Sequence, residues 1–183
     1  MADACPVVNL GASANLKDRG VDVFQEMDQV AMMRPVTKWA EQATHTHKIP
    51  QLVSTAFRHA LSPPFGAVYL DMPNDIVGGV VEDSNWDHPA RRSSHYRTEA
   101  RPYGDPALIK KAVDLLAKAE KPVIITGSGV FWSQGGPEME EFINATGIPF
   151  YTTPQGRGVV SEDHKRFYGG ARSMAFQQAD VVL

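Results

Sequence analysis

The chain of 183 residues contains only one cysteine, Cys5. A single cysteine excludes an intrachain disulfide and any metal cluster built from several thiolates. The sequence also lacks an apolar run of the roughly 20 residues that span a bilayer. Its N-terminus lacks the basic segment followed by an apolar stretch that marks a secretory signal. We therefore expect a cytoplasmic protein without a membrane partner.

An excess of charge of one sign is also missing. The chain carries 18 Lys and Arg against 21 Asp and Glu, for a net charge of −3, and the two signs are interspersed. This balance argues against a nucleic-acid surface as the main function. With 43% hydrophobic and 21% charged residues, the composition is that of an ordinary globular protein. The length allows one large domain or two small or incomplete ones.

In the first half of the chain, short apolar runs alternate with segments whose apolar residues have helical spacing. The patterns predict a short buried strand at residues 6–10, a helix over 22–33, an amphipathic helix over 49–61 and a buried strand at 67–70. A helix that feeds a short apolar strand is the α/β pattern. The segment 76–104 is polar, charged and proline-bearing, without a sustained period, which predicts an interdomain linker.

The same alternation returns after the linker, where Asp105 provides a capping side chain before a proline at the start of a helix. Further strands are predicted at 123–126, 148–151 and 181–183, and further helices from Pro137 and at 171–178. We therefore expect an α/β protein made of two incomplete three-layer units with parallel sheets, at residues 1–75 and 105–183, joined by a linker at 76–104. Because the chain stops on a strand, we also expect a truncated piece of a longer protein.

Two donor-rich loops follow predicted strands of the second unit. Gly127-Ser128-Gly129 lies between a strand and a helix, where a phosphate-binding turn would be placed. The dinucleotide fingerprint requires a third glycine, and Trp132 stands in its place. Thr153-Pro154 opens the second loop, at the same carboxyl edge at which open α/β sheets bind ligands. The residues leave two alternatives open, a nucleotide-like ligand or two tight turns.

The stretch Thr44-His45-Thr46-His47 raises the question of a metal site. No third ligand follows at a regular spacing, so we expect a solvated loop there and assign no metal ligands. Neither the nucleophile elbow Gly-x-Ser-x-Gly nor the phosphate loop Gly-x-x-x-x-Gly-Lys occurs.

Several stretches together resemble one enzyme family. They are residues 23–30, 34–40, 66–75, 121–125, 153–160 and 170–183. In this order they are similar to thiamine-diphosphate-dependent enzymes of the acetolactate synthase and 2-hydroxyacyl-CoA lyase superfamily. The resemblance implies that residues 1–75 are the C-terminal half of a pyrimidine-binding domain. It also implies that residues 105–183 are the N-terminal part of the central, nucleotide-binding-like domain.

The resemblance implies carbon–carbon bond formation or cleavage on 2-keto acids, in which the cofactor supplies the electron sink and the protein supplies positioning. By the same resemblance Phe24 walls the substrate pocket, Gln25 offers hydrogen bonds to the substrate, and Lys38 matches a position near the pocket entrance that is often basic. Core packing on an amphipathic helix is the alternative for Phe24.

In flavin-bearing members of this family, the loops matching Gly127, Ser128, Gly129, Thr153 and Pro154 lie against FAD. Members that use CoA tend to carry a lysine where Ser128 stands and an arginine near Pro64, and this sequence lacks both cations. Because phosphate recognition relies on charge-assisted donors, the resemblance points to an acetolactate-synthase-like enzyme. A 2-hydroxyacyl-CoA lyase or an oxalyl-CoA decarboxylase type is the alternative.

The family's cofactor-activating glutamate and its Mg²⁺- and diphosphate-binding signature are expected outside this chain, and Glu26 is not the equivalent of that glutamate. Thiamine diphosphate and Mg²⁺ are therefore expected in the intact family enzyme. The chain by itself is expected to be inactive and to need a homo-oligomer or a complementing chain. Two further hypotheses are a stand-alone FAD- or ADP-binding module without catalysis and a remnant that does not fold.

Overall fold

The computed structural model describes residues 4–82 and 103–183. The chain divides into two compact units, residues 1–100 and 101–183. In the described ranges, none of the helices combines the length and the apolar character needed to cross a bilayer.

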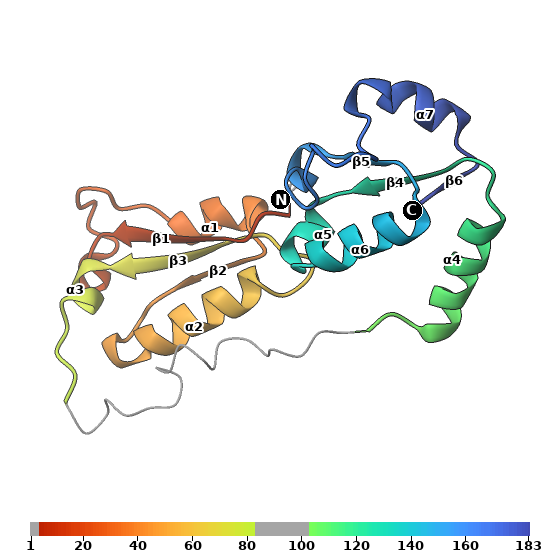
Figure 1. The fold of residues 1–183 in the computed structure, drawn as a ribbon. Helices are drawn as coiled ribbons and strands as arrows, with labels where there is room; N and C mark the ends of the chain where they lie inside the picture. Colours follow the sequence, from red (N-terminus) through yellow and green to blue (C-terminus); the bar gives the residue numbers. More distant parts are fainter. Residues whose placement is uncertain (1–3, 83–102) are drawn as a thin grey trace. The chain divides into compact units, whose positions relative to one another are not determined.

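The first unit is built on a parallel sheet of three strands, shown at the red and yellow end of the colour scale in Figure 1. The strands are β1 (Val7–Ser13), β2 (Trp39–Gln42) and β3 (Ala67–Pro73). Their order is β1-β3-β2, so β3 lies in the middle. The register places Gly11 of β1 and Gln42 of β2 opposite the same residue of β3, Asp71.

Helices cover both faces of this sheet. α2 (Ile49–Ala60) packs Ala56 and Ala60 against Val68, and the partly buried Val8 and Trp39 complete the cluster. α1 (Gln29–Met33) lies on the opposite face (Figure 1). Short elements complete the unit. They are the 3-10 turns η1 (Leu16–Asp18), η2 (Arg34–Val36) and η3 (Thr46–Lys48), and the helix α3 (Asn74–Val77).

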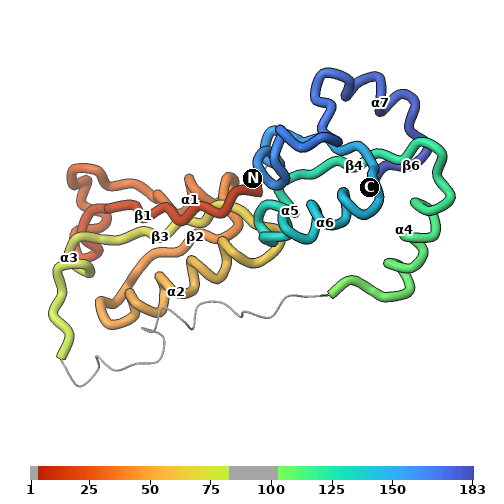
Figure 2. Tube along the Cα trace, in the orientation of Figure 1, coloured from red at the N-terminus to blue at the C-terminus, as the bar shows by residue number. Residues whose placement is uncertain are grey.

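The second unit contains another parallel sheet, in the order β5-β4-β6. Its strands are β4 (Pro122–Thr126), β5 (Phe150–Thr152) and β6 (Val181–Val182). The helices are α4 (Pro106–Lys118), α5 (Ser128–Trp132), α6 (Gly136–Thr146) and α7 (Arg172–Gln178), with 3-10 turns η7 (Pro154–Gly156) and η8 (Gly169–Ala171). The tube in Figure 2 follows the chain from β5 through α7 to β6, on the other side of β4.

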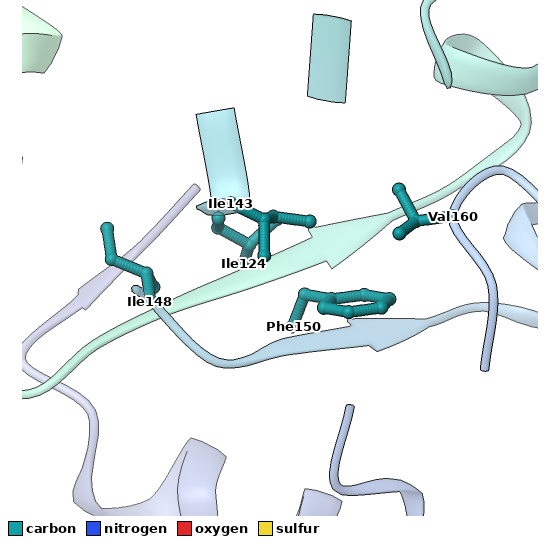
Figure 3. Packing of buried hydrophobic residues seen from close by; sticks show 5 residues of the cluster. All are labelled: Ile124, Ile143, Ile148, Phe150 and Val160. Carbon is teal, nitrogen blue, oxygen red and sulfur yellow. The ribbon is translucent and has the colours of Figure 1, made fainter. Parts of the chain in front are cut away.

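An apolar cluster fills the second unit between its sheet and α6. Its buried members are Ile124, Ile143, Ile148, Phe150 and Val160, seen from close by in Figure 3. On the other face, the ring of Phe176 in α7 lies 5.6 Å from the ring of Tyr151. Sheet and helices therefore form three layers in this unit as well.

Local signals explain the ends of the clearest helices. The side chain of Asp105 accepts a hydrogen bond from the backbone N–H of Ala107 at 2.8 Å and caps α4, as predicted. Gly147 follows α6 with φ +69, the left-handed conformation that favours glycine at a helix C-terminus.

The predicted α/β class with parallel sheets is confirmed, whereas two local predictions are wrong. The helix predicted over 22–33 exists only from Gln29, because Gln25 has a left-handed backbone (φ +64) that a helix cannot contain. The strand predicted as buried at the N-terminus is an edge strand, in which Val7 and Leu10 are about half exposed. Of the predicted linker, residues 83–102 lie outside the described residues.

Candidate functional site

The loop 20–28 presents Phe24 to solvent. The Phe24 side chain is 88% exposed and belongs to no helix, so core packing in this unit is excluded as its role. The carboxylate of Glu26 accepts hydrogen bonds from the backbone N–H groups of Gly20 and Val23. Donation from Gly20, the largest cause, lowers the pKa of Glu26 below its ordinary value of 4.5. These hydrogen bonds connect Glu26 to the first half of the loop and stabilise the loop conformation.

Gln25 stands at the tip of this loop in a left-handed backbone conformation. Such a conformation in a residue other than glycine costs about 1–3 kcal/mol and persists only where the surroundings impose it. The structure therefore brings the two predicted substrate-pocket residues, Phe24 and Gln25, together on an exposed loop that is anchored at Glu26. Lys38 has a structural contact, since its Nζ donates to the carbonyls of His59 (2.8 Å) and Ser62 (2.6 Å) at the end of α2.

A polar network, absent from the sequence-based predictions, runs across the first sheet from the buried Tyr69 and Asp71 of β3 to partly buried side chains on either side. Gln29 donates through Nε2 to the carbonyl of Ala12 (3.0 Å), and its Oε1 accepts from the Tyr69 hydroxyl. The hydroxyl is shared with Asp71 Oδ1 at 3.3 Å, and Asp71 Oδ2 accepts from Gln42 Nε2. Burial, followed by the Asp71 charge, raises the pKa of Tyr69 to about 12, so the hydroxyl remains a donor.

In the second unit, the two predicted nucleotide loops lie side by side at the carboxyl edge of the sheet. The N–H of Thr153 donates to the carbonyl of Thr126 at 2.9 Å. The Thr153 hydroxyl accepts from the N–H of Gly156 at 3.2 Å and caps η7. A Cβ at Gly156 would lie 2.1 Å from the Thr126 carbonyl oxygen. The close approach of these backbones locks the loops together.

The glycines of the first loop are not required by the protein itself. Gly127 has an extended backbone (φ −135), and a Cβ there would make only an ordinary contact of 3.4 Å with Thr153 Oγ1. A Cβ at Gly129 would meet no atom within 4 Å. Glycine without a conformational or packing requirement is the pattern expected where another molecule approaches the backbone. The structure thus brings Gly127, Ser128, Gly129, Thr153 and Pro154 to one surface and leaves that surface open.

Two hollows are lined by other residues of the described ranges. An apolar one of about 360 Å³ is lined by residues of α4 and α6, among them Leu116 and Phe142. The other, about 420 Å³, is lined by His45 and His47 among others, and the two imidazole rings meet edge-on with centroids 5.4 Å apart. Across residues 4–82 and 103–183, no group of three or more His, Cys, Asp or Glu side chains is placed to hold a metal ion.

Comparison with known proteins identifies the class. Residues 109–183 match the family model described as "Thiamine pyrophosphate enzyme, central domain". Over these residues the chain resembles the central domain of the thiamine-diphosphate-dependent enzymes, to which its motifs also pointed.

Along nearly its whole length the chain is similar to one segment of 2-hydroxyacyl-CoA lyases and acetolactate synthases. It is 34% identical over 179 residues to the 2-hydroxyacyl-CoA lyase of Arabidopsis thaliana, covering 97% of this chain and 31% of that protein. It is 34% identical over 190 residues to a probable acetolactate synthase large subunit of Methanocaldococcus jannaschii, covering 100% of this chain and 32% of that protein. The chain thus spans about a third of the length of these relatives.

The match to a thiamine pyrophosphate enzyme domain implies thiamine diphosphate as the cofactor of the intact enzyme. The described ranges contain no cluster of three or more His, Cys, Asp or Glu side chains that could hold a metal ion, and the carboxylate of Glu26 accepts hydrogen bonds from backbone N–H groups. No described residue of this chain is therefore assigned to Mg²⁺, to the diphosphate or to activation of the cofactor.

Proposed function

We propose that this chain supplies part of the substrate pocket of a thiamine-diphosphate-dependent enzyme that makes or breaks a carbon–carbon bond of a 2-keto acid. The observation that carries the proposal is the exposure of Phe24, which is 88%, on a loop that Glu26 anchors. Phe24 shares this loop with the exposed Val21 and Met27, and grouped exposed apolar side chains mark a surface that another molecule can cover. Similarity to two kinds of thiamine-dependent relatives supports the same reaction class.

Phe24 and Gln25 have different roles in this proposal. When bound, thiamine diphosphate supplies the electron sink. Phe24 walls the pocket and excludes water, and the amide of Gln25 can both donate to and accept from the polar end of a 2-keto acid. The left-handed backbone at Gln25 (φ +64) sets the direction in which its side chain leaves the loop.

An acetolactate-synthase type of reaction is favoured over a lyase that uses CoA. Ser128 stands in an open glycine-rich loop and offers no positive charge to a CoA phosphate, although such recognition relies on charge-assisted donors. The relatives include both types, so cleavage of a 2-hydroxyacyl-CoA is the alternative reaction. We further propose that the chain alone is inactive and works with another copy or a complementing chain.

The second unit is proposed to hold the nucleotide part of FAD, or ADP itself, against Gly127, Ser128, Gly129, Thr153 and Pro154. The open space at Gly129 supports this contact, because a flat ligand can reach the backbone there. The same observation favours a second candidate function, a nucleotide-binding module without catalysis.

A chimera tests the reaction. This chain would replace the matching segment of the Methanocaldococcus relative, to which it aligns along its whole length. Acetolactate formation from a 2-keto acid and cleavage of a 2-hydroxyacyl-CoA would be measured. We expect the synthase reaction, and we expect Phe24→Ala to lower kcat/KM roughly tenfold or more, since one apolar pocket contact is worth about 1–3 kcal/mol. A folded chimera that is active and indifferent to Phe24→Ala would refute the substrate role.

Thermal unfolding of the purified chain tests the nucleotide contact. FAD or ADP at a hundred times its dissociation constant should stabilise the native state by about 2.7 kcal/mol, whereas thiamine diphosphate with Mg²⁺ should give no shift. Gly129→Val should abolish the FAD or ADP shift. Gly170→Val is the matched control, because a Cβ at Gly170 also meets no atom within 4 Å. A shift that survives Gly129→Val would place the nucleotide elsewhere.

A further inference from the structure

Two polar side chains interrupt the apolar centre of the first sheet. Tyr69 is 3% exposed and Asp71 is 1% exposed, and both lie on the middle strand β3 between β1 and β2. Side chains two residues apart on a strand point to the same face. Both therefore lie on the face opposite to Val68, which packs against α2. A buried carboxylate and hydroxyl are retained only where hydrogen bonds satisfy them.

The path of the Tyr69 ring is set by Gly11 on the neighbouring strand. A Cβ at Gly11 would lie 2.1 Å from the Tyr69 hydroxyl oxygen and 2.6 Å from two ring atoms. The missing side chain thus lets the ring pass over β1. The hydroxyl then reaches Gln29, the first residue of α1.

Gln29 ties down the C-terminal end of the loop 20–28. Its side chain is engaged on both sides, since Nε2 donates to the carbonyl of Ala12 and Oε1 accepts from Tyr69. Its backbone N–H donates to the carbonyl of Met27 at 3.0 Å. Asp28 adds a cap to α1 by accepting from the N–H of Ala31 at 2.8 Å. The loop therefore ends at a side chain that the sheet holds directly.

The other branch of the same network reaches the N-terminal end of the loop. Asp71 Oδ2 accepts from Gln42 Nε2, and Gln42 Oε1 accepts from Arg19 Nη2 at 3.1 Å. Arg19 directly precedes Gly20, whose N–H is bound by Glu26. A continuous series of hydrogen bonds thus joins both ends of the loop through the centre of β3.

We propose that Tyr69 and Asp71 are positioning residues, which hold both ends of the loop 20–28 and thereby fix the direction of Phe24 and Gln25. The role of that loop in substrate binding rests on the proposed function, whereas the positioning itself does not. The left-handed backbone of Gln25 needs such a constraint, because strain persists only where the surrounding structure imposes it.

Amide hydrogen exchange on the intact chain tests the positioning. Tyr69→Phe keeps the ring over Gly11 and removes only the hydroxyl. We expect the amides of Gly20 and Val23, which Glu26 binds, to exchange about tenfold faster in this variant, because loss of a hydrogen bond opens local structure without global unfolding. Amides of α2 should keep their protection. Tyr151→Phe is the matched control, since Tyr151 is also 3% exposed on a strand but belongs to the other unit.

A second variant keeps the proposal testable if Tyr69→Phe does not fold. Arg19→Met changes an exposed side chain and removes only the tether at the N-terminal end, so it should loosen Gly20 while α2 stays protected. Unchanged exchange of the loop in both folded variants would overturn the proposal.

Kinetics of the chimera separate this proposal from the proposed function. Tyr69→Phe should raise KM for the 2-keto acid more than it lowers kcat, because Phe24 and Gln25 would both be present but held less firmly. If Phe24→Ala has no kinetic effect while Tyr69→Phe still speeds exchange of the loop, the substrate role fails and the positioning stands. If Phe24→Ala impairs catalysis while Tyr69→Phe changes neither exchange nor KM, the positioning fails.

Discussion

Replacement of Gly156 by alanine should strongly destabilise the second unit. The added Cβ would lie 2.1 Å from the Thr126 carbonyl oxygen, 2.6 Å from the Thr126 carbonyl carbon and 2.9 Å from the Gly127 nitrogen. These are backbone atoms of β4 and its loop, so no side-chain rotation can relieve the contact. The two loops must instead move apart.

The expected loss follows from two contributions. Overpacking of this kind costs about 1–3 kcal/mol. Separation of the loops also weakens the hydrogen bond from Thr153 to Thr126, now 2.9 Å long, which contributes about 1 kcal/mol. A total of roughly 2–4 kcal/mol should lower the thermal midpoint of a unit of this size by about 10 °C or more.

Thermal unfolding followed by circular dichroism measures this loss, with Gly129→Ala as the matched control. A Cβ at Gly129 meets no atom within 4 Å, and alanine favours a helix over glycine, so the control should unfold at or above the parent midpoint. Equal midpoints for Gly156→Ala and Gly129→Ala would show that the approach of the two loops is not rigid, and the reasoning would be wrong.

Three further predictions concern the first unit. Because backbone donors depress the pKa of Glu26 below 4.5, the hydrogen bond that it accepts from Gly20 should persist above pH 4.5 and be lost as the pH falls through the lowered pKa. The amide proton resonance of Gly20 should move upfield in that pH range, and Glu26→Gln should abolish the titration. Lys38→Met removes two bonds to carbonyls at the end of α2 and should cost about 1 kcal/mol in denaturant unfolding, with no loss contradicting a capping role. Phe24→Ala should change stability by less than about 0.5 kcal/mol, and a larger loss would mean that Phe24 packs in a core after all.

Elements whose signals are local could be predicted from the sequence. The amphipathic stripe over residues 49–61 matches α2, the Asp105 cap marks the start of α4, and Gly147 marks the end of α6. Each of these signals lies within the element that it defines, so no knowledge of distant residues is needed.

β2 could not be predicted, because its stability depends on a distant strand. Trp39–Gln42 contains two polar residues among four and no apolar run, and it forms a strand by pairing with Val68–Asp71 of β3. The helix predicted over 22–33 was too long, since Val23 and Met27 stand at helical spacing from Val30 but only Val30 lies in α1. Asp28 was the available signal, because its side chain caps α1 and marks the true start at Gln29.

The roles of Phe24 and Gln25 in a substrate pocket were implied only by family resemblance. The hydrogen bonds that hold their loop join residues far apart in the sequence. Gln29 and Gln42 lie 40 and 29 residues from the partners that they contact on β3, so spacing could not connect them. Asp71 inside an otherwise apolar strand was the one sequence signal that a polar network would be found there.

The passage of Tyr69 over Gly11 links the evolution of two strands. A side chain larger than hydrogen at position 11 would collide with the tyrosine ring and force it to move, so substitution there is disfavoured as long as the tyrosine remains. Once position 69 carries a smaller residue, the collision disappears and position 11 becomes free to vary. Mutations at these two sites should therefore be accepted more readily when position 69 changes first.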